Sequence, residues 1–497
     1  MTRFRMHDTA QIFVAFSLIA IFSFTFSAAS AQAQSPVPAQ IGAPVRPAPA
    51  DPAISKALQQ VSAAQVQATI EKLVSFNNRS TLSSMDKDLP PGQGVTAAAD
   101  WIYSQFEAYS KACGGCLEVK RDTFIDPVAP RVPQPTTLTN VYAILRGSDP
   151  VQAKRMYLVT GHYDSRNSDT FNTRDPAPGA NDDASGVAVS LESARVLSKM
   201  KFPATLVFVA VAGEEQGLDG SHHLAELAKS EGWDLQGVLN NDIVGGNTTP
   251  GDTLQDKTAV RVFSEGVPRV TTPQQLQILR GFGGENDSSS RELARAMVDA
   301  SRTYSTGFHP VLIFRQDRFG RGGDHYSFNQ QGFAAVRVTE WREDYNHQHQ
   351  DVRKVNGVQY GDMLQFVDFN YVARVAKANA ATLAVLASAP PAPKNVRLDI
   401  QAQENVSKLS WEPGDGSPVG TQFEVVWRDT SAPDWQRMYD AKAATNVTLP
   451  MSKDNVIFGL RSVDAAGHRS LVATPLPYSP HPPINLDHTK TTAAPAK

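Results

Sequence analysis

The sequence predicts an α/β domain with a mostly parallel central sheet flanked by helices, followed by a small all-β domain. Short apolar runs occupy residues 140–145, 156–160, 205–212, 238–239 and 334–338. Several are apolar throughout, as strands buried on both faces are. Stretches with helical spacing separate them, and this alternation is typical of a parallel sheet, whose ligands gather at the carboxyl ends of the strands.

The spacing of apolar residues predicts helices over 63–76, 95–108, 187–197, 221–229, 290–304 and 360–386. Ser289 and Glu292 are spaced as in a capping box, which predicts the start of the fifth of these helices. Together the strands and helices define a large α/β domain over residues 62–388.

A different pattern begins after the Pro- and Ala-rich stretch 387–393. Short strands with turns are predicted at 396–400, 408–411, 422–427 and 456–462, within a domain over 394–475. Leu409-Ser410-Trp411 resembles the tryptophan-bearing strand of a fibronectin type III sandwich, and Phe423, Val425 and Trp427 alternate as an inward face would. Residues 476–497, rich in Pro, Thr and Ala, are expected to form a disordered tail.

Length and composition indicate an ordinary globular protein with more than one domain. The chain has 497 residues, more than a single hydrophobic core usually serves. It is 41% hydrophobic and 20% charged, and 47 basic against 50 acidic residues give a net charge of −3. Neither nucleic acid nor an anionic membrane surface is therefore expected as a partner.

The first residues have the pattern of a signal peptide. Arg3 and Arg5 precede an apolar stretch over 12–26, and A-x-A cleavage patterns follow between 29 and 33. An uncleaved membrane anchor is the alternative, but a bilayer span needs about 20 apolar residues. We expect a signal peptide at 1–33, a Pro- and Ala-rich linker at 34–61, and a mature protein without a membrane span in the periplasm or outside the cell.

Only two cysteines are present, Cys113 and Cys116, in the sequence Cys-Gly-Gly-Cys. A structural zinc site would need four ligands, and no second Cys or His pair lies nearby. A thioredoxin-like redox motif lacks its strand-to-helix context here. In an oxidising compartment, a short-range disulfide is the expected outcome.

Residues able to bind metal follow the predicted strands. His162 and Asp164 come directly after the strand 156–160, although a histidine there is more often structural. Asp182 and Asp183 precede the helix 187–197, where the simpler interpretation is a helix N-cap. An aspartate at that point is also suited to bridge two cations with its two oxygens.

Glu214 and Glu215 are adjacent after an apolar strand, where their charges would repel unless cations or protons compensate. One can bind metal while the other takes a proton from a metal-held water. Asp242 follows another short strand. The segment 345–351 contains two further histidines, His347 and His349. Polar loops often contain histidines that have no function.

In this order, the motifs resemble those of the two-zinc aminopeptidases of peptidase clan MH, which also includes glutamate carboxypeptidase II and glutaminyl cyclases. The resemblance spans about 62–388. It implies that His162 and Asp242 bind one zinc, Glu215 and His347 the other, and Asp182 bridges both, with Glu214 as general base. His347 is preferred to His349 because the family pattern His-Thr-x-x-Asp places an aspartate four residues later, here Asp351. The supporting partners of His162 and His347 are then Asp164 and Asp351.

The segment Gly323-Asp324-His325 resembles the family's Ser-Asp-His, which lies near substrate, so Asp324 and His325 are expected in the substrate pocket. The implied function is an exported enzyme that hydrolyses N-terminal residues from peptides with a hydroxide held between two zinc ions. Cobalt or manganese are possible substitutes. The alternatives are a single-zinc glutaminyl cyclase, a carboxypeptidase of the same fold, and a binding protein that has lost catalysis. Residue specificity and oligomeric state stay open.

Overall fold

The computed structural model describes residues 41–401 and 403–478. Every described helix and strand belongs to one compact unit that begins at Gly42. The predicted signal peptide, 1–33, lies outside the described residues, as does the predicted tail from 479 onward. Among the described residues, no helix combines the length and the apolar character that a bilayer crossing requires.

The large domain contains one eight-stranded sheet, ordered β2-β3-β5-β4-β6-β9-β7-β8. The four central strands, β5, β4, β6 and β9, are parallel, whereas β3 and β7 are antiparallel to their neighbours β5 and β9. This confirms the predicted α/β class with a mostly parallel sheet. The strands are β2 Leu117–Asp126, β3 Thr136–Leu145, β4 Arg155–His162, β5 Thr205–Val211, β6 Asp234–Asn241, β7 Ala259–Ser264, β8 His309–Ile313 and β9 Ala335–Glu340.

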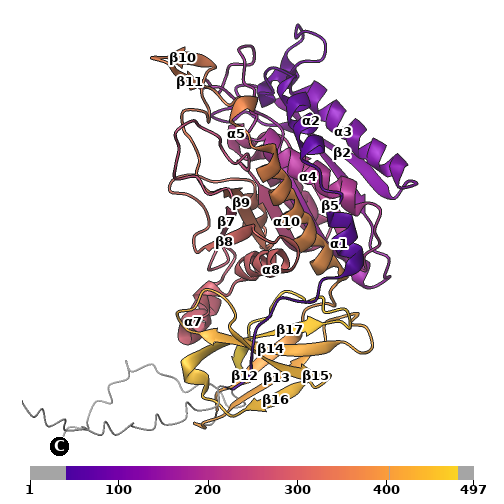
Figure 1. Cartoon of the computed structure of the whole chain (residues 1–497), viewed down its shortest axis with the longest axis vertical. Helices are drawn as coiled ribbons and strands as arrows, with labels where there is room; N and C mark the ends of the chain where they lie inside the picture. The colour runs from indigo at the N-terminus through magenta and orange to yellow at the C-terminus, as the bar shows by residue number, and fades with distance from the viewer. Residues whose placement is uncertain (1–40, 402, 479–497) are drawn as a thin grey trace, which may run out of the picture. The chain divides into compact units, whose positions relative to one another are not determined.

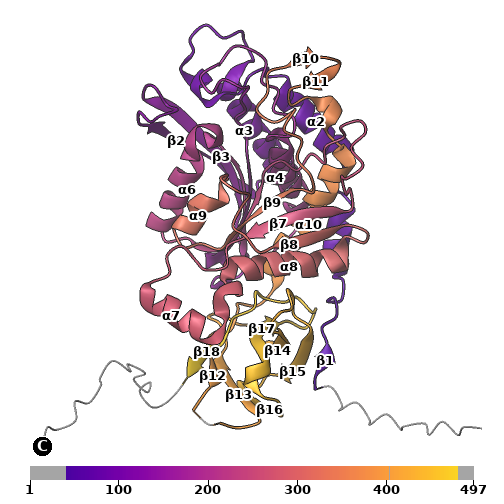
Figure 2. The same ribbon diagram turned by 90° about the vertical axis from the view of Figure 1, so that its left-hand side faces the viewer.

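Helices cover both faces of this sheet (Figure 1; Figure 2). Side chains of β5 alternate between two apolar clusters: Leu206 and Phe208 face α2, α3, α4, α8 and α10, whereas Val207 and Val209 face α6 and α9. Both faces of the sheet are therefore buried under apolar side chains, which explains why these strands are apolar throughout. The helices are α2 Ala63–Val74, α3 Gly94–Ala112, α4 Ala184–Leu197, α5 Glu214–Gly217, α6 Asp219–Ser230, α7 Pro273–Phe282, α8 Ser289–Tyr304, α9 His325–Gln330 and α10 Phe369–Ser388.

Helix α4 approaches the middle of the sheet unusually closely. A Cβ atom at Gly186 would lie 2.1 Å from the carbonyl oxygen of Asn241, so only glycine fits there. The first turn of α4 is thereby held against the carboxyl ends of β4 and β6.

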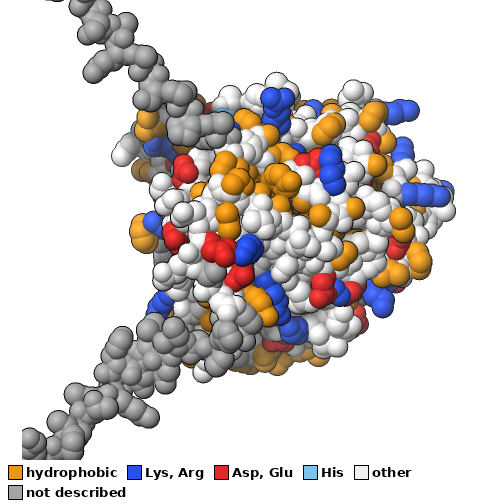
Figure 3. Space-filling view, turned by 90° about the horizontal axis from the view of Figure 1, so that it is seen from below, with side chains coloured by type: hydrophobic (Ala, Val, Ile, Leu, Met, Phe, Trp, Pro, Cys, Tyr) orange, Lys and Arg blue, Asp and Glu red, His pale blue; other side chains and the backbone are white. Residues whose placement is uncertain are grey.

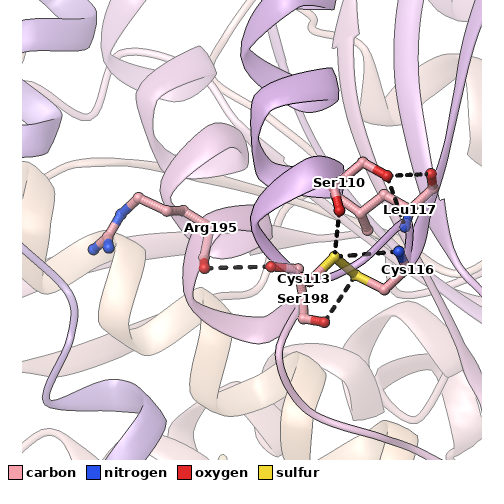
Figure 4. The surroundings of a disulfide bond; sticks show 6 residues. All are labelled: Ser110, Cys113, Cys116, Leu117, Arg195 and Ser198. Carbon is pink, nitrogen blue, oxygen red and sulfur yellow. Dashed lines mark hydrogen bonds between the residues drawn. A yellow bond between two sulfur atoms is a disulfide. The ribbon is translucent and has the colours of Figure 1, made fainter.

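The predicted disulfide between Cys113 and Cys116 is present (Figure 4). It closes the turn between α3 and β2, and the Ser110 hydroxyl donates a hydrogen bond to the Leu117 carbonyl across that turn, at 2.8 Å. The Sγ of Cys116 also lies 3.0 Å from the carbonyl oxygen of Ser198, just beyond α4. The disulfide therefore links the end of α3 to the start of β2, next to the end of α4.

The C-terminal domain is built of two four-stranded sheets, β1-β15-β14-β17 and β16-β13-β12-β18. Trp411 and Phe423, from opposite sheets, meet in its core with ring centroids 5.8 Å apart. This agrees with the predicted all-β domain. Its strands are β1 Ala43–Pro44, β12 Lys394–Asp399, β13 Ser407–Glu412, β14 Gln422–Asp429, β15 Arg437–Lys442, β16 Asn446–Leu449, β17 Val456–Val463 and β18 Leu476–Tyr478. On the face shown in Figure 3, basic and acidic side chains are interspersed.

Buried ion pairs join this domain to α8. The Asp287 carboxylate, just before α8, accepts hydrogen bonds from Arg295 at 2.8 Å and from Arg428 of β14 at 2.8 and 2.9 Å. The indole N–H of Trp435 donates a hydrogen bond to Glu292 at 3.0 Å.

The predicted capping box at the start of α8 is wrong. Ser288, and not Ser289, is the N-cap, because its side chain accepts a hydrogen bond from the backbone N–H of Arg291. Glu292 faces the C-terminal domain instead.

The predicted linker at 34–61 is partly folded, which corrects that boundary. Residues 43 and 44 form β1, which pairs with β15, and a short helix, α1 Pro52–Leu58, is capped by Asp51. Ile54 and Leu58 are buried, 1% and 2% exposed. Proline at the first helical position and an aspartate cap favour this helix, although the composition suggested a flexible chain. The predicted tail likewise begins within β18, at 476–478.

We predict that Leu58→Ala lowers the free energy of unfolding by about 2–4 kcal/mol, because it removes a buried side chain from the large domain's core. Lys56→Ala, on the exposed side of α1, is the matched control and should change it little. Urea unfolding of the mature protein measures both. Equal, negligible effects would mean that this segment is a linker after all.

Candidate metal centre

Four of the five residues predicted to bind metal converge at the carboxyl ends of the parallel strands, together with the predicted general base Glu214. His162 ends β4, Glu214 and Glu215 follow β5, and Asp242 follows β6. Asp182 precedes α4, whose first turn is held between these strands. The topology therefore brings together side chains spread over 188 residues of sequence, from 162 to 349.

Two groups of ligand-type atoms result. The first is His162, Glu214 and Asp242, and the second is Asp182, Glu215 and His349, each with its atoms within 4.8 Å of one another. In the second group, Nε2 of His349 lies 3.0 Å from Asp182 Oδ2 and 3.1 Å from Glu215 Oε2. These are compact sets of one imidazole with two carboxylates.

Asp182 links the two groups. Its Oδ1 lies 3.1 Å from Nε2 of His162 in the first group, and its Oδ2 faces His349 in the second. Its two oxygens thus point to different histidines, as a carboxylate between two cations would.

The donor atoms fit zinc. Imidazole nitrogens and carboxylate oxygens are ordinary zinc ligands. Among the described residues, Nε2 of His162 and Oε1 of Glu215 are buried without a hydrogen-bond partner, which is costly unless another group satisfies them. A cation at each group would do so.

The protonation behaviour also indicates an affinity for positive charge. Burial alone would lower the pKa of His349, but the carboxylates of Glu215 and Asp182 outweigh it and raise this pKa to about 10. Burial raises the pKa of the Glu214 carboxyl well above its usual range, and Asp242 adds to this. The metal-free cluster therefore holds protons tightly, and a divalent cation would displace them.

Asp183 has a different task from its neighbour, to which it is joined by a cis peptide bond. Its carboxylate accepts hydrogen bonds from the backbone N–H groups of His162 at 3.0 Å and Gly186 at 2.9 Å. It is the N-cap of α4 and lies in neither group. The helix-cap interpretation thus applies to Asp183, and Asp182 is the one that reaches the cluster.

Asp164 holds residues of both groups in place. Its carboxylate lies 3.4 Å from Nδ1 of His162 and accepts hydrogen bonds from the backbone N–H groups of Glu214 at 3.3 Å and Glu215 at 3.1 Å. Thr81 also donates to it, at 2.9 Å. One buried carboxylate thus orients ligands of both groups.

The structure corrects the choice of His347. Its ring stacks on Phe366, with centroids 3.6 Å apart, and the one carboxylate of the described residues within 4.0 Å of its Nε2 is that of Asp344, at 3.9 Å. His349 reaches the cluster because its backbone adopts a φ of 55°, a left-handed turn that spacing cannot reveal.

The supporting role predicted for Asp351 is also wrong. Its exposed carboxylate accepts hydrogen bonds from the Ser168 hydroxyl at 2.7 Å and the Ser168 N–H at 3.2 Å, and is paired with neither histidine. It ties the loop after β9 to the loop after β4 instead.

Asp324 and His325 were expected to line the substrate pocket. Both are fully buried, so neither lines an open pocket. Nε2 of His325 lies 3.0 Å from the Gln316 carbonyl, and burial lowers the pKa of its imidazole to about 4. Burial raises the pKa of Asp324 to about 7, and its carboxyl lies close enough to Glu214 to help raise that group's pKa. Both residues therefore belong to the buried surroundings of the metal centre.

Three supporting residues were not predicted. Gln348 donates to Asp182 Oδ2 at 3.1 Å, and Arg337 pairs with Asp242 Oδ2 at 2.8 Å. Asp362 accepts from the backbone N–H of Asp182 at 2.7 Å. Only Arg337 gave a signal in the sequence, because an arginine within an otherwise apolar strand is seldom buried without a partner.

Comparison with known proteins agrees with this geometry. Residues 140–366 match the model of peptidase family M28. A "Probable zinc metalloprotease" of Pyrenophora teres f. teres is 44% identical over 447 residues, which cover 88% of this chain and 90% of the relative. A protein of the same description from Pyricularia oryzae is 43% identical over 434 residues, 86% of this chain and 85% of the relative.

Solved structures match more distantly. The LapA aminopeptidase of Legionella pneumophila is 20% identical and has a TM-score of 0.46, with 67% of this chain and 74% of that one covered. The glutaminyl cyclase of Porphyromonas gingivalis is 17% identical and has a TM-score of 0.44, with 65% and 97% covered.

We predict that His349→Ala weakens zinc binding by more than the roughly 10- to 100-fold that loss of a supporting residue costs, because a ligand is lost. His347→Ala is the matched control from the same loop and should keep its zinc. Competition with a chromogenic chelator measures both affinities. A loss confined to His347→Ala would restore the assignment that sequence spacing favoured.

Proposed function

The chain belongs to peptidase family M28 and is a zinc metallopeptidase, and on that premise we propose that it is a two-zinc aminopeptidase. The observation that carries the proposal is Asp182, whose two oxygens face the two separate groups of donors. One zinc would be held by His162 and Asp242, the other by Glu215 and His349, with Asp182 shared. Cobalt or manganese would suit the same donors.

Zinc, when bound, lowers the pKa of water toward about 7 and polarises the substrate carbonyl. In this mechanism Glu214 takes the proton from the attacking water and later gives it to the departing amine. Its position suits this task, because Asp164 fixes the backbone N–H groups of Glu214 and Glu215 while Glu214 keeps part of its surface exposed. A carboxyl whose pKa is raised by burial is also a better base than a fully hydrated one.

The charges of the site disfavour a substrate carboxylate next to the general base. Asp242, Glu215 and Asp324 each help to raise the pKa of the Glu214 carboxyl, so a further anionic group there would meet like charge. The buried Arg337 guanidinium is already paired with Asp242, so it is not free to receive a substrate carboxylate.

We predict that Glu214→Gln lowers kcat by roughly 10²- to 10⁴-fold, because it removes the proton acceptor, while zinc content stays unchanged. Glu226→Gln, on the exposed side of α6, is the matched control. The assay is hydrolysis of leucyl nitroanilide, with zinc measured by mass spectrometry. Unchanged turnover in Glu214→Gln would remove Glu214 from the mechanism.

Product analysis separates the competing functions. A peptide with a free amino terminus should lose that residue, and its N-acetylated form should resist. Release of residues from the carboxyl end would indicate a carboxypeptidase. Closure of an N-terminal glutamine without hydrolysis would indicate a glutaminyl cyclase, for which a single zinc would suffice.

Export is part of the same proposal. The signal-peptide pattern at 1–33 is supported by the Cys113–Cys116 disulfide, because disulfides persist in oxidising compartments. We predict that the protein expressed with its native N-terminus is recovered outside the cytoplasm, with a new N-terminus close to residue 34. Amino-terminal sequencing tests this, and a full-length chain retained in the cytoplasm would contradict it.

A further inference from the structure

A solvent-open groove lies beside the metal centre, between the segment after β8 and the loop after β9. It measures about 480 Å³, and we call it the arginine groove. Its lining includes Arg261, Arg315, Arg318, Arg321, Phe319 and Tyr345. None of these residues belongs to either group of metal ligands.

The groove carries an excess of positive charge. Three of its arginines share one carboxylate, that of Glu343: Arg261 approaches it at 2.9 Å, Arg318 at 2.6 Å and Arg321 at 3.1 Å. Asp317 balances Arg318 in part but also faces Arg337. Too few carboxylates therefore remain for these guanidinium groups, although the whole chain has a net charge of −3.

Arg315 adds a further positive charge. It lies over the ring of Phe319, with 3.8 Å between its Cζ and the ring centroid, and forms no ion pair within the described residues. Its side chain is exposed, so it is available to an incoming anion.

The aromatic rings of the groove are unusually open. Phe319 is 84% exposed and Tyr345 is 62% exposed. Large apolar side chains left in water beside arginines are typical of surfaces that bind a partner chain, since aromatic and arginine residues dominate such contacts.

Hydrogen bonds connect the groove to the metal centre. Arg321 donates to the Gln348 side-chain oxygen at 3.0 Å, and the Gln348 amide donates to Asp182 Oδ2 at 3.1 Å. Arg321 is thus separated by a single side chain from the carboxylate that faces both groups of donors. A peptide whose scissile bond lies at the metal centre can reach the groove within a few residues.

We propose that the arginine groove binds an anionic group of the peptide substrate, an acidic side chain or the terminal carboxylate, on the part that extends beyond the scissile bond. The inference rests on the proposed aminopeptidase function, in which only the first residue lies on the other side of that bond. The rest of the peptide must leave through a solvent-open surface, and this groove offers one with complementary charge.

The test compares three peptides that share an amino-terminal leucine. The first carries a glutamate at the third position and an amidated carboxyl end. The second, neutral peptide has glutamine at that position and the same amidated end. The third has glutamine at that position and a free terminal carboxylate. The zinc-loaded enzyme should cleave one or both anionic peptides with a kcat/KM about fivefold above that of the neutral one, the size expected for one exposed ion pair. Added salt should reduce the preference. Which anionic peptide is preferred distinguishes the side chain from the terminal carboxylate.

Arg315→Gln should bring the anionic-to-neutral ratio of kcat/KM close to one. Arg146→Gln is the matched control: it is an exposed arginine at the opposite edge of the sheet, paired with Glu118, and should keep the wild-type ratio. A wild-type enzyme without charge preference, or an unchanged ratio in Arg315→Gln, would overturn the inference.

A binding measurement separates this inference from the proposed function. Fluorescently labelled versions of the same peptides are titrated with zinc-loaded Glu214→Gln protein, so that no turnover is needed. Tighter binding of the anionic peptides that is lost on adding Arg315→Gln supports the groove even if the catalytic assignment fails. Equal affinities for all three peptides contradict it even if the enzyme is an aminopeptidase.

Discussion

The structure depends on one electrostatic constraint: several buried carboxylates lie at one edge of the sheet, where they would repel one another without positive charge between them. Asp182, Glu215 and Asp242 are each at most 6% exposed. Two histidines and Arg337 supply part of the compensation. The negative charge that they leave uncompensated makes the region suited to divalent cations rather than to apolar packing. Nε2 of His162 and Oε1 of Glu215, which are buried there without a hydrogen-bond partner, are available as metal ligands.

The surrounding structure holds that cluster in place. Asp164 binds the N–H groups of the Glu214–Glu215 pair, Asp183 binds those of His162 and Gly186, and Asp362 binds that of Asp182. A carboxylate fixed to backbone groups in this way positions a neighbouring ligand without binding metal itself. The acidic cluster and the arginine groove differ in sign, so in the proposed binding mode the two ends of a peptide would have different surroundings.

Much of this was predictable from the sequence because the central strands are buried on both faces, so their apolar runs mark them, and the polar residues that follow each run mark the site. Strands β2, β7 and β8 have weaker patterns and were not predicted. The choice between His347 and His349 depended on a left-handed turn at His349. The composition of 42–61 suggests a linker because the burial of this segment comes from partners distant in sequence. The spacing of Ser289 and Glu292 suggests a local cap, whereas Glu292 binds Trp435, 143 residues away.

The most direct test of this account is anomalous diffraction from crystals of the zinc-loaded protein, with data on both sides of the zinc absorption edge. The account predicts two peaks about 3.5–4 Å apart, the separation usual for two-metal sites. One should lie next to His162 and Asp242, the other next to Glu215 and His349, with Asp182 in contact with both. A single peak, or a peak beside His347, would contradict the claim that Asp182 joins two metal sites.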